Sequence, residues 1–366
     1  MKTEIHPFRL VVKALLLFIL INIIYALIAP PIYKVSGYNT IFPGRVRFPF
    51  GDGSDPYIVA VDNLDAMVAS HAISAPKKPN EYRVVIIGDS SVWGEDLTAQ
   101  ESISWQWNQL NDQCNKMELE FYNLGYPHPS VVKDLMILDK AMEYDPDMIV
   151  WFVTLNTLVP LQITQFIAAN SDRAAKIVET YDIPFNYENE LVASNVAFYR
   201  KTLVGRRSDL ARAIKLQALG FVWSATETDV SLPAEPVRLS PDVKSDDRYK
   251  GMTPDTDLEN VMLLKVLTTG HAMADSLPVL LVNEPIYIAT GRNSEVRYND
   301  SYPRWAYDQY RNVMASEAEK NNWHYLDLWD VVPVEYFSDT RFHVSAEGER
   351  LLVEHVNPVL QTIACH

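Results

Sequence analysis

The stretch RVVIIGDSSVWG at residues 83–94 decides the fold, because a buried strand ends in it at a serine. The β-branched apolar run at its start predicts that strand. Thr98 and Glu101 follow at the spacing of a helix-capping box, so a helix is expected next. Ser90 therefore lies in the turn where open α/β sheets bind ligands, and it is a candidate nucleophile. The alternative interpretation is a plain turn, since Gly, Asp and Ser all favour turns.

The rest of the chain alternates apolar runs with helical patterns, which predicts a parallel sheet with helices on both faces. We therefore expect an α/β fold, with a three-layer α/β/α arrangement of flavodoxin-like type around a parallel five-stranded sheet. Strands are expected at 83–87, 119–123, 148–153, 278–282 and 324–327, and helices at 97–114, 131–144, 259–274 and 304–320.

Length, charge and cysteine content limit what the protein binds. The 366 residues suffice for one large domain or two small ones, and the formal net charge is −15. That charge argues against a nucleic-acid partner, whose phosphates need a basic face. Cys114 and Cys365 are the two cysteines, and no CxxC or close Cys/His cluster occurs, which argues against structural zinc. We expect no metal and no other cofactor.

Residues 10–29 form an apolar segment long enough to cross a membrane. Positive charges at Lys2, Arg9 and Lys13 favour a cytoplasmic tail at 1–9 and an extracytoplasmic (periplasmic or extracellular) remainder, as in a single-pass signal-anchor. A cleaved signal peptide is the alternative, but bulky Leu27 fits a small-residue cleavage site poorly. Outside the cytoplasm a disulfide persists, so Cys114–Cys365 is a candidate pair.

Three further segments follow from composition. Residues 30–80 contain many prolines and glycines and are interpreted as a stalk or approach segment, with the catalytic domain at 81–366. An insertion at 158–258 interrupts the alternation between the third and fourth strands and is too long for an ordinary connection. A basic, amphipathic run at 200–224 is either a lid or membrane-surface helix, or a solvated helical face packed on the core.

Polar or small residues follow three of the expected strands: Ser90, Gly125 and Asn156. The ends of parallel strands meet at one edge of a sheet, so these residues are expected to gather there. Asp339 and His343 come later, in a loop before a final helix that Ser345 is expected to cap.

This set of blocks, in this order, resembles the SGNH (GDSL-type) hydrolase superfamily. The blocks are GDSSVWG, NLGYP, TLNT and an acid and histidine before a glycine-containing helix, over about 82–156 and 276–360. Two features depart from the family pattern. Thr154 stands where the family often has glycine, and three residues separate Asp339 from His343 instead of the usual two.

The chemistry of these residue types agrees with that resemblance. His343 can take the Ser90 proton as a general base, and Asp339 can orient its imidazole. Asp327, Asp330 or no acid at all are the alternatives to Asp339. The backbone N–H groups of Ser90 and Gly125 and the Asn156 side chain are candidate oxyanion donors.

The expected function is a membrane-anchored serine esterase or O-acyltransferase. It would act on acyl esters, such as acetyl esters, of cell-envelope glycans or lipids through an acyl-enzyme. Envelope-modification proteins are the expected kind of protein partner. The sequence leaves hydrolysis and transfer open. A catalytically inactive binding or assembly subunit of an envelope complex is the alternative from a different class, and the altered acid–histidine spacing is what motivates it.

Overall fold

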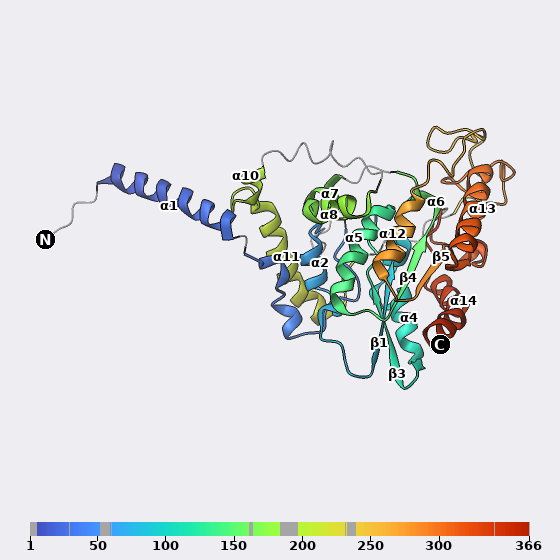
Figure 1. Ribbon diagram of the computed structural model, residues 1–366, viewed down its shortest axis with the longest axis horizontal. Coiled ribbons are helices and arrows are strands. Elements are labelled where there is room, and N and C mark those ends of the chain that lie inside the picture. The colour runs from blue at the N-terminus through green and yellow to red at the C-terminus, as the bar shows by residue number, and fades with distance from the viewer. Residues whose placement is uncertain are drawn as a thin grey trace.

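A computed structural model describes residues 6–28, 30–51, 59, 61–160, 164–183, 197–230, 232, 239–339 and 341–365. At its centre lies a six-stranded sheet in the order β2-β3-β1-β4-β5-β6 (Figure 1). The strands are β1 (Glu81–Ile87), β2 (Gln113–Cys114), β3 (Met117–Asn123), β4 (Met148–Val153), β5 (Val279–Asn283) and β6 (His324–Asp327). The five strands that the sequence predicted are all present and are parallel to one another.

The prediction of a five-stranded, purely parallel sheet was wrong at one edge. Strand β2 adds a sixth strand and pairs antiparallel with β3. Asn115 and Lys116 connect the two strands with φ of 51° and 73°, the backbone of a tight two-residue hairpin. The helix expected at 97–114 therefore stops early, because the chain turns back to form this hairpin.

Helices pack on both faces of the sheet, as expected. Their bounds are α1 (Pro7–Ile28), α2 (Leu64–Ala69), α3 (Ser90–Trp93), α4 (Ile103–Leu110), α5 (Val131–Ala141), α6 (Leu155–Leu158), α7 (Thr164–Ala169), α8 (Ser171–Tyr181), α10 (Ala197–Lys201), α11 (Arg207–Thr226), α12 (Leu264–Ala274), α13 (Arg304–Asn321) and α14 (Ala346–Ala364). The insertion supplies α7, α8, α10 and α11, and the parts of it at 161–163, 184–196, 231 and 233–238 lie outside the described residues.

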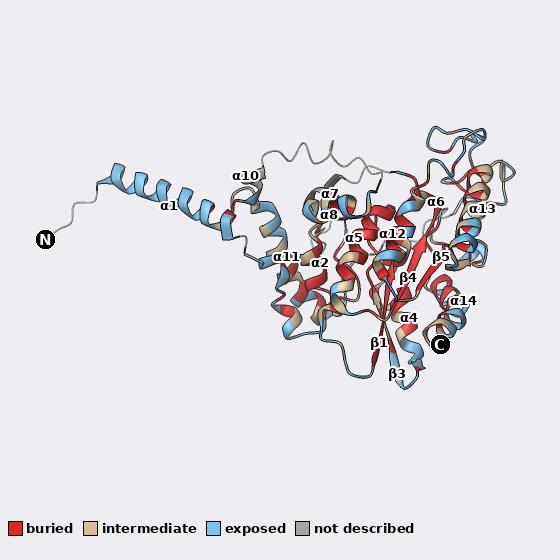
Figure 2. Ribbon diagram, viewed as in Figure 1, coloured by how far each residue is buried: buried red, intermediate tan, exposed pale blue. Residues whose placement is uncertain are grey.

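Alternate side chains of the strands divide the interior into two cores. In β1, Val85 and Ile87 face the core that contains α5 and α12, while Val84 and Ile86 face the core that contains α4 and α14. Both sets are buried (Figure 2). A strand buried on both faces reads as a continuous apolar run, which is why the sequence pattern located these strands well.

Much of the segment that we expected to be a stalk is part of the folded domain. Tyr38, Phe48, Met67 and Ile73 are buried, and the last three belong to the core on the α5 side of the sheet. Irregular backbone rich in proline and glycine predicted a linker, but irregular backbone packs equally well when its side chains are apolar. The other predicted domain boundaries stay predictions.

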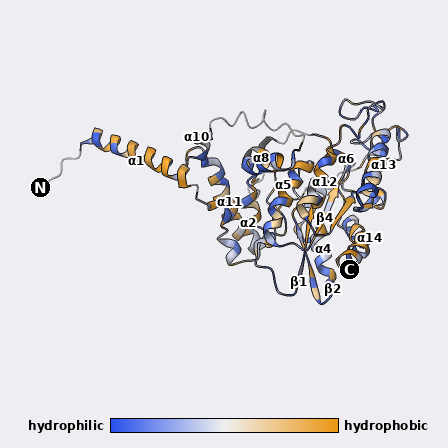
Figure 3. Ribbon diagram, viewed as in Figure 1, coloured by the Kyte–Doolittle hydropathy of each residue, from blue (hydrophilic) through white to orange (hydrophobic). Residues whose placement is uncertain are grey.

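Helix α1 projects from the domain and is exposed along nearly its whole length (Figure 2). Its 22 residues are almost all apolar, and it is long and apolar enough to cross a membrane (Figure 3). It covers the predicted span at 10–29 except for Ala29, which lies outside the described residues together with residues 1–5 of the predicted cytoplasmic tail.

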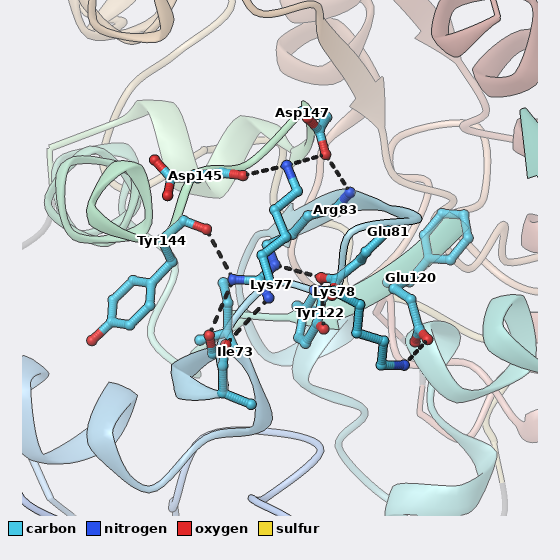
Figure 4. Close-up of polar contacts among 12 residues, drawn as sticks. Ile73, Lys77, Lys78, Glu81, Arg83, Glu120, Tyr122, Tyr144, Asp145 and Asp147 are labelled. Carbon is cyan, nitrogen blue, oxygen red and sulfur yellow. Dashed lines mark hydrogen bonds and ion pairs between the residues drawn. The ribbon is translucent and has the colours of Figure 1, made fainter. Parts of the chain in front are cut away.

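A buried ion pair ties the approach segment to the beginning of the sheet (Figure 4). The Arg83 guanidinium pairs with Glu81 at 2.6 Å and donates hydrogen bonds to the carbonyl oxygens of Ile73 and Tyr144. The hydroxyl of Tyr122 donates to the same Glu81 carboxylate at 2.9 Å. One charged side chain thus holds three segments that are distant in sequence.

Replacing Arg83 tests how much this pair stabilises the domain. Arg83→Met leaves the Glu81 carboxylate buried without its counter-charge, so the free energy of unfolding is expected to fall by about 3–5 kcal/mol. The control is Lys78→Met, which breaks an exposed pair with Glu120 and is expected to cost about 0–1 kcal/mol. Chemical denaturation in detergent micelles, followed by tryptophan fluorescence, measures the free energy of unfolding of both variants. Equal losses in the two variants would contradict the stabilising role of the Arg83–Glu81 pair.

Candidate active site

Ser90 is the first residue of α3, in a tight turn at the carboxyl end of β1. Asp89 precedes it, and its carboxylate accepts hydrogen bonds from the Ser91 backbone N–H and hydroxyl at 3.1 and 3.2 Å. Gly94 ends this short helix with a φ of 85°, which a residue with a side chain rarely adopts. The sequence prediction of a strand, a turn at Ser90 and a following helical region is confirmed.

Arg47, in the approach segment, binds the backbone that follows this turn. Arg47 is fully buried, and its guanidinium donates hydrogen bonds to the carbonyl oxygens of Trp93, Gly94 and Leu97. The same group forms an ion pair at 2.8 Å with Asp229 of the insertion. Arg47 therefore fixes the exit of the turn, although nothing in its local sequence indicated such a role.

The structure brings Ser90, His343 and Asp339 together in one hydrogen-bonded chain. The Ser90 Oγ atom lies 2.8 Å from His343 Nε2, and His343 Nδ1 lies 3.0 Å from an Asp339 carboxylate oxygen. A carboxylate only accepts, so the ring proton resides on Nδ1, and Nε2 accepts the proton of the serine hydroxyl. This is the geometry in which an imidazole activates a serine.

The unusual spacing between acid and histidine is accommodated by the loop that carries them. The other carboxylate oxygen of Asp339 accepts hydrogen bonds from the backbone N–H groups of Arg341, Phe342 and His343 at 2.8–3.1 Å. These bonds wrap the loop around the acid and aim the imidazole back at it. The competing acid Asp327 instead pairs with Arg311 at 2.7 Å.

Charges around His343 favour its protonated form. Burial lowers the pKa of the imidazole, but the hydrogen bond and charge of Asp339, together with the charges of Glu95 and Asp89, outweigh burial and raise it above its ordinary value. Glu95 lies 3.5 Å from Nε2, on the same side of the ring as Ser90. For the Asp339 carboxyl, burial raises the pKa, but the contacts with His343 lower it more, so the net shift in its pKa is downward.

Gly125 packs directly against the nucleophile turn. A Cβ atom at this position would lie 2.7 Å from the Trp93 backbone nitrogen and from a Val92 methyl group, so only glycine fits. Its N–H donates to the Asn123 side chain at 2.9 Å, and the Asn123 amide donates to the Val92 carbonyl at 2.6 Å. Asn123 thus links two loops of the site, and the predicted oxyanion role of Gly125 stays a prediction.

Asn156 lies in α6, directly after β4, the neighbour of β1 in the sheet. Its side-chain oxygen accepts a hydrogen bond of 2.8 Å from the hydroxyl of Tyr249, a buried residue of the insertion. This bond fixes the orientation of the Asn156 carboxamide and leaves its NH₂ group available as a donor. The insertion therefore reaches the site through Tyr249, a residue for which the sequence predicted no role.

Lys133 links the two site loops that contain Gly88 and Tyr126. Its ammonium group is fully buried and donates hydrogen bonds to the carbonyl oxygens of Gly88 and Tyr126 at 2.8 and 2.6 Å. Asp134 provides the counter-charge at 2.8 Å. The helical pattern at 131–144 was predicted correctly, but that pattern alone did not indicate that Lys133 points toward the site loops.

Two buried glutamates, Glu284 and Glu349, line a small cavity behind the site, together with Ser91. Burial, with the charge of Asp89, raises the pKa of Glu284 well above its ordinary value, and burial does the same for Glu349. Burial therefore favours the neutral form of both carboxyls, and that form adds no negative charge beneath the serine.

No protein-family model and no curated protein matches the chain. Among solved structures, it is similar to a proposed lipolytic protein of the G-D-S-L family from Desulfitobacterium hafniense, with 14% identity, a TM-score of 0.37 and coverage of 76% of this chain and 99% of that chain. A member of the lipolytic protein G-D-S-L family from Veillonella parvula has 11% identity, a TM-score of 0.37 and coverage of 76% and 97%. A carbohydrate acetylesterase family member from Sinorhizobium meliloti has 12% identity, a TM-score of 0.36 and coverage of 77% and 99%.

The position of Glu95 predicts a pH effect on Ser90. Glu95→Gln removes a negative charge beside Nε2 and lowers the pKa of His343, so Ser90 becomes reactive at a lower pH. The midpoint of the pH profile for labelling by a fluorophosphonate is expected to fall by roughly one unit or less. Glu354→Gln, on the exposed side of α14, is the matched control. An unchanged midpoint in Glu95→Gln would show that Glu95 does not act on the imidazole.

The raised pKa of Glu284 predicts a second effect, on stability. Its pKa is higher in the folded than in the unfolded protein, so the folded state loses stability as the pH rises above the ordinary pKa of glutamate. Glu284→Gln lacks this loss, and its Tm relative to the wild-type Tm is expected to rise from about pH 5 to pH 8. Exposed Glu259→Gln serves as the control. Parallel Tm curves for wild type and Glu284→Gln would mean that Glu284 is ionised in the fold.

Proposed function

We propose that the protein is a serine esterase or O-acyltransferase of the SGNH (GDSL-type) hydrolase class. The observation that carries the proposal is the unbroken chain of hydrogen bonds from the Ser90 hydroxyl through His343 to Asp339. The order of these residues along the chain and their positions at strand ends agree with the resemblance found in the sequence. An ester is the proposed substrate class because an alkoxide is a better leaving group than the nitrogen of an amide, so one proton from the histidine suffices to release it.

In the first step Ser90 Oγ attacks the acyl carbon while its proton moves to His343 Nε2. The carbonyl double bond opens and an oxyanion forms. When the carbonyl reforms, the bond to the alcohol oxygen breaks, and the imidazolium returns its proton to that oxygen. The alcohol leaves and the acyl group remains on Ser90. Asp339 stabilises the imidazolium throughout and stays ionised.

Three donors are proposed for the oxyanion. The Ser90 N–H has no intrahelical acceptor, because Ser90 begins α3. The Asn156 NH₂ group is free to donate, because Tyr249 binds the side-chain oxygen. The Gly125 N–H would have to exchange its bond to Asn123 for a bond to the oxyanion. Each donor that forms contributes on the order of 3 kcal/mol to stabilising the transition state.

The second step decides between hydrolysis and transfer. His343 removes a proton from water or from an acceptor hydroxyl, and the resulting oxygen nucleophile attacks the acyl carbon and releases Ser90. Water as the acceptor gives an esterase, and a sugar hydroxyl as the acceptor gives an O-acyltransferase. We propose acyl esters, such as acetyl esters, of cell-envelope glycans or lipids as substrates. A domain tethered through α1 outside the cytoplasm remains close to such material.

Labelling with a fluorophosphonate probe tests the proposal. The wild-type protein is expected to form a covalent adduct that Ser90→Ala abolishes. Asp339→Asn leaves the imidazole without its orienting acid, so the labelling rate is expected to fall by about a hundredfold or more. Ser208→Ala, at an exposed serine of α11, is the control and is expected to label like the wild type.

The opposite result supports the other class of function. If the wild-type protein remains unlabelled while circular dichroism and a cooperative thermal transition show that it is folded, Ser90 is not activated. The chain would then act as a binding or assembly subunit of an envelope complex rather than as an enzyme.

A further inference from the structure

The approach segment and α11 lie on the side of the domain from which α1 projects (Figure 1), and both carry exposed apolar side chains. We call this the anchor-side face, and its members are Ile32, Val35, Ile41, Phe42, Ile214 and Phe221. Ile41 and Ile214 are each 70% exposed, an unusual degree for isoleucine. These residues come from two segments of the chain, the approach segment and α11.

Close packing holds the two segments together and decides which side of α11 faces outward. Gly220 lies against the ring of Tyr38, where a Cβ atom would come within 2.2 Å of a ring carbon. The rings of Phe42 and Phe221 meet edge to face at 5.7 Å. With Gly220 turned inward, Ile214 and Phe221 point away from the core. Their exposure therefore results from packing that fixes the helix.

A polar contact connects this region to α1 itself. The side-chain oxygen of Asn22 accepts a hydrogen bond of 3.0 Å from the Val204 backbone N–H, and Asn22 is only 8% exposed. Asn22 precedes the last residue of α1 by six positions, which corresponds to about 9 Å along the helix. The corner between α10 and α11 therefore lies level with the last two turns of α1, not beyond its end.

The residues at this corner match the interfacial region of a bilayer. Phe198 and Tyr199 are exposed aromatic residues, and Lys201 and Arg207 are exposed basic residues. Residues 197–226 contain six basic residues and one acidic residue, in a chain whose net charge is −15. Aromatic rings and basic side chains are enriched where a membrane protein meets lipid headgroups.

We propose that the α10–α11 corner and the anchor-side face lie in the outer headgroup and acyl boundary of the bilayer that α1 crosses. The occupant of the exposed apolar face is phospholipid, because the face is continuous with the anchor and its charge is opposite to that of acidic headgroups. The domain then rests on the membrane instead of standing away from it. This inference rests on the proposed anchor and is independent of the ester chemistry.

Depth-dependent quenching in the full-length protein tests the inference. Added cysteines at Phe198→Cys and Ile214→Cys carry a nitrobenzoxadiazole dye, and nanodiscs of phosphatidylcholine and phosphatidylglycerol contain lipids with a spin label near the headgroup or, in a parallel sample, deep in the acyl chain. Leu16→Cys, inside α1, is the positive control, and Asp255→Cys, on an exposed loop, is the negative control. Both test positions are exposed, so the substitutions leave the core intact.

The proposal expects the spin-labelled lipid to reduce fluorescence at positions 198 and 214 by about twofold, as for groups held at the interface, and to leave position 255 unchanged. Quenching at position 16 but not at 198 and 214 would overturn it, and would leave the face open to a protein partner instead. Quenching at none of the four positions would overturn the anchor and this inference together. Fluorophosphonate labelling of Ser90 reports separately on the proposed function.

Discussion

The parallel pairing of β1 with β3 on one side and β4 on the other is the constraint on which the site depends. Parallel neighbours point the same way, so the turns that follow β1, β3 and β4 meet at one edge of the sheet. Those turns carry Ser90, Gly125 and Asn156. Because β1 is buried on both faces, a shift in its register would displace the serine and disturb both cores at once.

The remaining part of the site comes from the far end of the chain, and local hydrogen bonds rather than the sheet position it. The Asp339 carboxylate organises its own loop by accepting three backbone N–H groups, and this places the His343 ring within reach of Ser90. A spacing that departs from the pattern of the family that the sequence resembles thus still gives the hydrogen-bond geometry of a triad. The number of residues between the acid and the histidine does not by itself determine the distance between their side chains. Here the conformation of the loop accommodates one additional residue.

The sequence predicted what depends on short-range patterns. Apolar runs located all five long strands, and the cap at Ser345 forms as expected. The two-residue strand β2 was missed because so short a strand has no periodicity. The supporting residues Arg47, Lys133 and Tyr249 were missed for a different reason. Each acts through contacts with residues far away in the chain, and a single sequence does not record which buried partner a polar side chain will find.

The disulfide between Cys114 and Cys365 gives the domain a covalent topology with consequences for assembly. It closes a ring of chain that contains β3 and β4 but leaves β1 outside. In the finished sheet β1 lies between those two members of the ring. If the disulfide forms before folding, β1 must insert between β3 and β4 of an already closed ring. If the chain folds first, the disulfide closes the ring around a complete sheet. Because Cys365 is synthesised after all six strands, every newly made molecule is able to fold before the disulfide forms.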